Sequence, residues 1–76
     1  MAYESGERIA GAQNAQLLAN EITACAGKAQ LIVTQLVSGA GETLAVSGFN
    51  ALLLALANAT ATAEAQRAKL VEDMQD

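Results

Sequence analysis

Apolar and small residues recur along most of the chain at alternating spacings of three and four. This spacing brings side chains onto one side of an α-helix and is typical of helices that pack against each other over a long distance. The pattern predicts two such seams. The first seam consists of Gly11, Ala15, Leu18, Ile22, Cys25, Ala29, Ile32 and Leu36, and the second of Val46, Phe49, Leu53, Leu56, Thr60, Ala63, Arg67, Leu70 and Met74.

One glycine-dense stretch, Ser38-Gly39-Ala40-Gly41, separates the two seams. Glycine adopts positive φ at little cost and therefore favours the end of a helix and a tight connection. We expect a first helix over about 5–37, a turn at 38–41 and a second helix over about 42–75. Because the connection is so short, the helices should be antiparallel neighbours. The fold class expected is therefore all-α, a single antiparallel hairpin of two long helices spanning 1–76.

Small residues also recur at a spacing of four, a pattern that allows helix backbones to approach closely. Three such rows are present: Gly11, Ala15 and Ala19; Ala51, Ala55 and Ala59; Ala57, Ala61 and Ala65.

The hairpin should leave much of its apolar surface uncovered. Residues 49–57 read Phe-Asn-Ala-Leu-Leu-Leu-Ala-Leu-Ala, which is apolar on nearly every side of a helix, and such helices are normally buried. A chain of 76 residues with a single cysteine and no histidine has neither an internal disulfide nor a zinc site to support a small core. We therefore expect packing into a homo-oligomer or filament. The residues expected at the assembly interface are Leu18, Ile22, Ile32, Leu36, Phe49, Leu53 and Leu56.

The charged and reactive residues argue against several functions. The net charge is −4 and the four basic residues are scattered, so nucleic acid is not an expected partner. Without histidine, and with Cys25 in an apolar seam, no catalytic set forms, and we expect no enzyme activity, cofactor or metal. Cys25 is expected to be a small core residue, the alternative being an intermolecular disulfide. The N-terminal residues do not resemble a signal peptide, which favours a cytoplasmic location.

A membrane is a conditional partner. Residues 43–63 contain no charge over 21 positions, which is long enough to span a bilayer. Asn50, Asn58 and three hydroxyl residues interrupt this run, and flanking basic residues and aromatic belts are missing.

Three carboxylates are candidates for a pH response: Glu21, Glu42 and Glu64. Packing a carboxyl group into an assembly removes it from water and favours its neutral form, which would relax repulsion between copies of like charge. The alternative is that these residues form a solvated acidic surface.

The segment 37–68 contains Gly-Ala-Gly-Glu-Thr-Leu-Ala-Val and Ala-Leu-Ala-Asn-Ala-Thr-Ala-Thr-Ala-Glu-Ala-Gln. It resembles the R-body structural proteins of the RebB, or "killing trait", type, and Asn58, Ala59 and Gln66 match an Asn-Ala step and a Gln-rich tail. The charged residues 72–76 differ from the polar, alanine-rich end of that family. The resemblance implies subunits that polymerise into a ribbon wound in the bacterial cytoplasm, extending on acidification and disrupting membranes. Apart from copies of the chain itself, related paralogous subunits are a candidate partner, and the sequence does not decide whether they co-assemble.

Two alternatives stay open from the sequence. One is a small membrane-active hairpin of the holin or bacteriocin kind. The other is a phage structural accessory protein that forms a closed oligomer.

Overall fold

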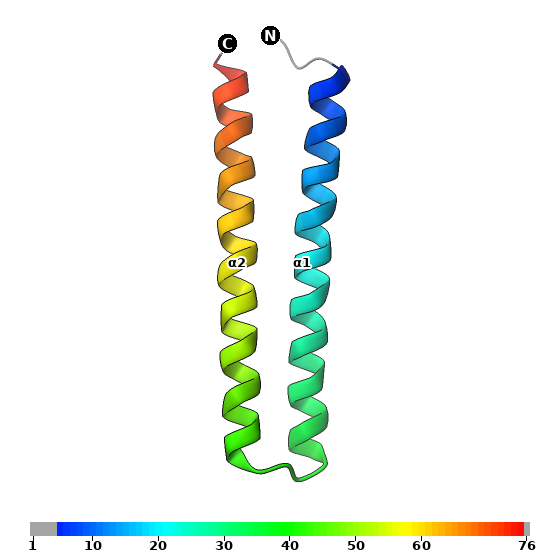
Figure 1. The fold of residues 1–76 in the computed structure, drawn as a ribbon, viewed down its shortest axis with the longest axis vertical. Coiled ribbons are helices and arrows are strands. Elements are labelled where there is room, and N and C mark those ends of the chain that lie inside the picture. The colour runs from blue at the N-terminus through cyan, green and yellow to red at the C-terminus, as the bar shows by residue number, and fades with distance from the viewer. Residues whose placement is uncertain (1–4, 76) are drawn as a thin grey trace.

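The computed structural model is an all-α antiparallel hairpin of two helices, α1 (Ser5–Val37) and α2 (Glu42–Met74) (Figure 1). The structure describes residues 5–75, and side chains from residue 11 onward. The helices lie side by side along a molecule measuring 56 × 17 × 11 Å, with the start of α1 and the end of α2 at one extremity and residues 38–41 at the other. These bounds match the expected ranges except that α2 ends one residue earlier than 75.

The connection between the helices is a tight glycine-dependent turn. Gly39 has a φ of 81°, a conformation that L side chains rarely adopt. Its N–H donates to the Leu36 carbonyl at 3.2 Å, and the Ala40 N–H donates to the Gln35 carbonyl at 2.9 Å. This is the Schellman pattern that closes a helix C-terminus. The Gly41 carbonyl then accepts the first hydrogen bonds of α2, so the chain reverses direction within four residues.

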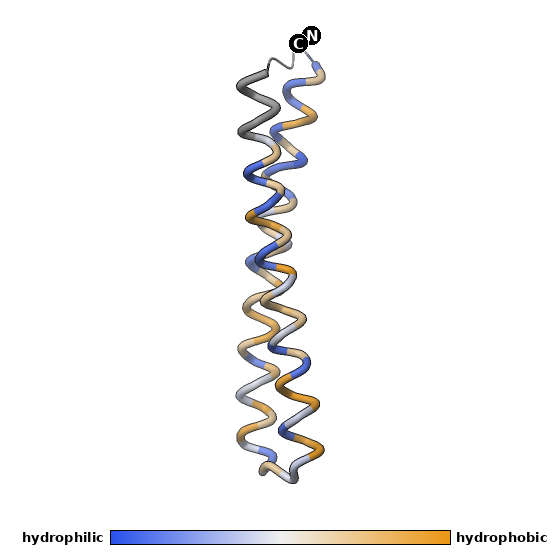
Figure 2. The backbone as a smooth tube through the Cα atoms, turned by 90° about the vertical axis from the view of Figure 1, so that its right-hand side faces the viewer, coloured by the Kyte–Doolittle hydropathy of each residue, from blue (hydrophilic) through white to orange (hydrophobic). Residues whose placement is uncertain are grey.

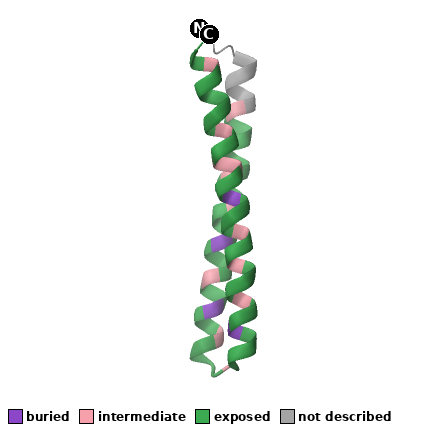
Figure 3. Cartoon of the chain, turned by 90° about the vertical axis from the view of Figure 1, so that its left-hand side faces the viewer, coloured by how far each residue is buried: buried purple, intermediate pink, exposed green. Residues whose placement is uncertain are grey.

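The surface between the two helices is narrow, and the buried positions of α2 within it are small residues. Figure 3 shows the few buried positions where the helices face each other, with most other positions exposed. Among the described residues, the buried apolar side chains are Cys25, Ile32, Ala45 and Ala59. The inner surface of α2 runs through Ala45, Gly48, Leu52, Ala55, Ala59, Thr62 and Gln66, all buried or half-buried at spacings of three and four.

The second predicted seam is therefore wrong as the contact between the two helices. Val46, Phe49, Leu53 and Leu56 are exposed, and the true inner positions precede them by one residue. One residue corresponds to a rotation of about 100° around a helix axis. Of the predicted second seam only Ala63 is half-buried.

The first predicted seam is correct in part. Ala15, Ile22 and Leu36 were expected on the inner side of α1 but are exposed. The preceding residues Glu21 and Gln35, which are polar and were not assigned to the seam, are half-buried there instead. Five members of the predicted seam are buried or half-buried: Gly11, Leu18, Cys25, Ala29 and Ile32.

Close approach at Ile32 explains the choice of inner surface. A Cβ atom at position 48 would lie 3.1 Å from Ile32 Cγ1, which is tighter than an ordinary van der Waals contact, so any residue other than glycine requires Ile32 to shift. Ala45 and Ala59 extend the small surface on either side of Gly48. Of the predicted rows of small residues, Ala55 and Ala59 lie at this contact, while Ala15, Ala19 and the row at 57, 61 and 65 are exposed.

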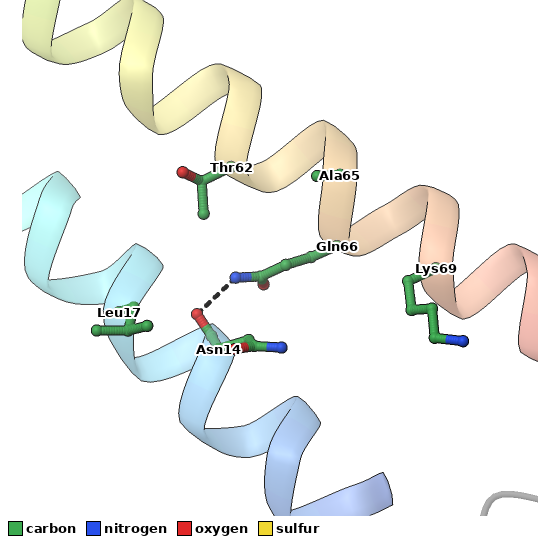
Figure 4. Close-up of a pocket in the computed structure, with 6 residues that line it drawn as sticks. All are labelled: Asn14, Leu17, Thr62, Ala65, Gln66 and Lys69. Carbon is green, nitrogen blue, oxygen red and sulfur yellow. Dashed lines mark hydrogen bonds between the residues drawn. The ribbon is translucent and has the colours of Figure 1, made fainter.

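Polar groups hold the helices together toward the open end. The Thr62 hydroxyl donates to Glu21 Oε2 at 3.3 Å and shares this hydrogen with the Asn58 carbonyl at 3.0 Å. Gln66 Nε2 donates to the Asn14 backbone carbonyl at 2.5 Å (Figure 4). These bonds fix which residues of α1 and α2 lie at the same level, and each has a modest net effect on stability, about 0.5–1.5 kcal/mol.

Candidate functional site

Large apolar side chains are mostly on the outside of the hairpin. Fifteen large hydrophobic residues of the described chain are exposed, compared with one, Ile32, that is buried. Figure 2 shows hydrophobic positions along both helices, densest in the half nearer the connection. The expectation that a single hairpin leaves much apolar surface uncovered is confirmed.

Helical geometry divides these residues between two sides. Each residue advances by about 100° around the helix axis. The number of residues between a position and the nearest inner position therefore tells on which side of the helix its side chain lies. On α2, Val46, Phe49, Leu53 and Leu56 lie on one flank. The other flank of α2 carries the exposed Leu44 and Leu54 together with Ala51, Ala65 and Lys69. On α1, Ile22, Ala26, Val33 and Leu36 lie on one flank, and Leu17, Ala24 and Leu31 lie on the other.

A shallow hollow identifies which flanks share a side of the hairpin. Leu17 from α1 lines this hollow together with Ala65 and Lys69 from α2 (Figure 4). Those two flanks therefore lie on one side, and the remaining flanks must lie together on the opposite side. We call this opposite side the apolar face, and define it by Ile22, Ala26, Val33 and Leu36 of α1 with Val46, Phe49, Leu53 and Leu56 of α2.

The apolar face gathers most of the residues predicted for an assembly interface. Five of the seven lie on it and are exposed: Ile22, Leu36, Phe49, Leu53 and Leu56. The other two, Leu18 and Ile32, point toward the partner helix inside the hairpin and are half-buried and buried.

Val33 and Val46 also belong to this face although they were not among the predicted interface residues. Val46 is three residues before Phe49, and Val33 is three before Leu36. The same helical spacing could have identified both.

The whole chain exposes more surface than a compact protein of its size. Its accessible surface is 5,581 Å² for a mass of 7.7 kDa. A compact monomer of this mass exposes about 4,300 Å². The hairpin thus carries an excess of about 1,200 Å², comparable to what a protein buries in specific contacts with others.

The three predicted carboxylates do not converge. Glu21 is half-buried and accepts the hydrogen bond from Thr62, whereas Glu42 and Glu64 are exposed. Glu42 begins α2 at the connection, far along the axis from the other two. Cys25 is buried against α2 with a free thiol. Among the described residues, no group of three or more metal-ligating side chains comes together.

Helix α2 satisfies the length and composition of a membrane span. Its most apolar window has a mean hydropathy of 1.5, and only 11% of that window is buried in the hairpin. Core helices of soluble proteins share this length and composition.

Comparison with protein-family models, with curated proteins and with solved structures finds no match to this chain.

Proposed function

We propose that this chain is a structural subunit that assembles with further copies of itself through the apolar face, without catalysis or cofactor. The observation that carries the proposal is the position of Phe49, Leu53 and Leu56. These side chains are exposed next to Ile22 and Val33 of α1, while the hairpin uses alanine and glycine for its own contact. The assembly we propose is a ribbon or filament in the bacterial cytoplasm, of the R-body kind that the sequence resembles.

The energies are of the right size for association. Burying a Leu, Val or Phe completely contributes about 1.5–3 kcal/mol, so the seven large, roughly half-exposed residues of the face contribute on the order of 7 kcal/mol per copy. Association costs about 4–15 kcal/mol in lost freedom of motion. Two copies that both bury this face therefore offset most of that cost, and further contacts per copy favour an extended assembly.

Leu53→Glu and Leu54→Glu form a matched pair that tests the proposal. The two leucines are adjacent in α2 and 61% and 65% exposed, but only Leu53 lies on the apolar face. In detergent-free buffer at neutral pH, we expect the parent chain and Leu54→Glu to form assemblies visible by negative-stain microscopy and sedimentation. Leu53→Glu should sediment as single copies.

The outcomes separate the possibilities. A parent chain that is monomeric without lipid overturns self-assembly. Polymers that persist in Leu53→Glu show that the apolar face is not the interface. Rings or discrete dimers would keep the interface but overturn the ribbon in favour of a closed oligomer.

A second candidate function, a membrane-active hairpin of the holin or bacteriocin kind, is favoured by the long uncharged run within α2. For that function, the chain should release dye from lipid vesicles at concentrations at which it is monomeric in buffer. Release that occurs only with preformed polymer supports the structural subunit instead.

A further inference from the structure

The two halves of the apolar face differ, because the α2 half is a continuous row of large side chains and the α1 half is interrupted by alanine at its centre. The α2 half presents the large side chains of Val46, Phe49, Leu53 and Leu56. At the same level along the hairpin, the α1 half is small at its centre, where Ala26 is exposed and Ala29 is half-buried.

The levels of the residues follow from contacts between the helices. Ile32 lies beside position 48, and Gln66 reaches Asn14. A residue of α1 and a residue of α2 therefore lie at the same level along the hairpin when their residue numbers add up to about 80. Leu53 is therefore level with the stretch between Ala26 and Ala29. The face thus carries a row of large side chains on α2 beside a gap at Ala26 and Ala29 on α1, with the large Ile22 and Val33 on either side of that gap.

Two copies can stack these faces about a two-fold axis in two ways. With the axis along the hairpin, both turns lie at the same end, and α2 of each copy lies over α1 of the other. With the axis across the hairpin, the turns lie at opposite ends, α1 lies over α1, and α2 lies over α2.

The same-end arrangement fits the face. It places Leu53 of one copy over Ala26 and Ala29 of the other, as in packing of large side chains into holes between small ones. The apolar parts near the two turns then overlap completely. The opposite-end arrangement with full overlap instead places the apolar half of each copy against the polar half of the other. A staggered overlap that brings the apolar halves together sets the large residues of α2 against each other.

The charges and areas favour a second copy as the occupant rather than a lipid surface. Residues 43–63 carry no charge, and Lys28, the basic residue of α1 in this half, lies on the opposite flank. The face therefore has no cation near the connection to contact lipid phosphates. A standard interface buries about 800 Å² per partner. The excess surface of the whole hairpin, about 1,200 Å² per copy, exceeds this area.

We infer that two copies pair through their apolar faces with their turns at the same end, forming an antiparallel four-helix unit that repeats in the assembly. This inference rests on the proposed function, because it specifies the geometry of the same interface.

Distances between spin labels test the geometry. A Cys25→Ala background removes the natural thiol, and Ser38→Cys or Gln75→Cys then places one label at the turn or at the open end. Labelled chain is diluted with unlabelled chain so that each label has few labelled neighbours. In the same-end pair, both variants should give a distance component near ~20 Å, since neighbouring helices lie 8–10 Å apart.

Each outcome is decisive. In an opposite-end pair with full overlap, the turns would be separated by nearly the 56 Å length of the hairpin. A staggered opposite-end pair would bring the turns together and move the open ends far apart. Either pattern in an assembled sample overturns the same-end pair and leaves the proposed function intact. Sedimentation of the labelled parent background as single copies overturns both.

Discussion

Ile32 of α1 lies directly over Gly48 of α2. A Cβ atom at residue 48 would come within 3.1 Å of Ile32 Cγ1 and within 3.4 Å of Gln35 Oε1. Ile32 is 4% exposed and is the one large hydrophobic residue among those described that the hairpin buries. The absence of a side chain at Gly48 therefore sets how closely the two helices approach near the connection.

Replacing Gly48 with leucine should destabilise the hairpin. Leucine is a better helix former than glycine, so any loss must come from the clash with Ile32. Overpacking of this kind costs about 1–3 kcal/mol. Urea unfolding followed by circular dichroism, at one fixed chain concentration, measures the change.

The control is Gly27→Leu in α1. No heavy atom lies within 4 Å of a Cβ at position 27, so leucine should leave stability unchanged or raise it by up to about 1 kcal/mol. Equal effects at both glycines would contradict the close approach.

Replacing Gln35 with methionine should stabilise the hairpin. The Gln35 Oε1 atom is buried and has no hydrogen-bond partner in the part of the chain that the structure describes. A buried acceptor without a partner costs about 1–3 kcal/mol, and methionine has a similar length without that atom. Thermal unfolding of the two proteins measures the gain.

Gln30→Met is the matched control for that change. Gln30 is exposed on the same helix, so its replacement should leave the melting temperature nearly unchanged. A loss of stability in Gln35→Met would mean that the amide of Gln35 contributes more through contacts than its buried oxygen costs.

Acidification should strengthen assembly. Each copy carries a net charge of −4, so copies repel one another at neutral pH, and protonation of carboxylates reduces that repulsion. A triple variant with glutamine at Glu21, Glu42 and Glu64 has a net charge of −4 + 3 = −1. It should assemble at a lower concentration at neutral pH and respond less to acid. The critical concentration for assembly at several pH values, measured by light scattering, checks this.

Glu72→Gln provides a comparison, since Glu72 is exposed near the open end of α2, away from the apolar face. It should change the pH response little. A triple variant that keeps the complete response of the parent chain would exclude these three carboxylates as its origin.

Local sequence signals predicted the helices and their connection. Good helix formers fill both halves of the chain, and the stretch from Ser38 to Gly41 contains the glycine that adopts positive φ. These features depend on near neighbours in the chain, so they can be recognised without knowledge of the tertiary contacts.

The orientation of α2 could not be predicted in the same way. The spacing of three and four occurs twice on this helix, once through Val46, Phe49 and Leu53 and once through Ala45, Gly48 and Leu52. Hydrophobicity favours the first series as the buried one. The structure instead buries positions of the second, because the fit between Ile32 and Gly48 depends on both helices at once.

The sequence by itself determined that the chain is a helical hairpin with more apolar surface than it can bury, since helix propensity, turn chemistry and composition are properties of the chain alone. Only the tertiary structure decided which surface is left outside. The small residues permit close contact between the backbones, and this contact rotates α2 so that Phe49, Leu53 and Leu56 join Ile22 and Val33 on one exposed face.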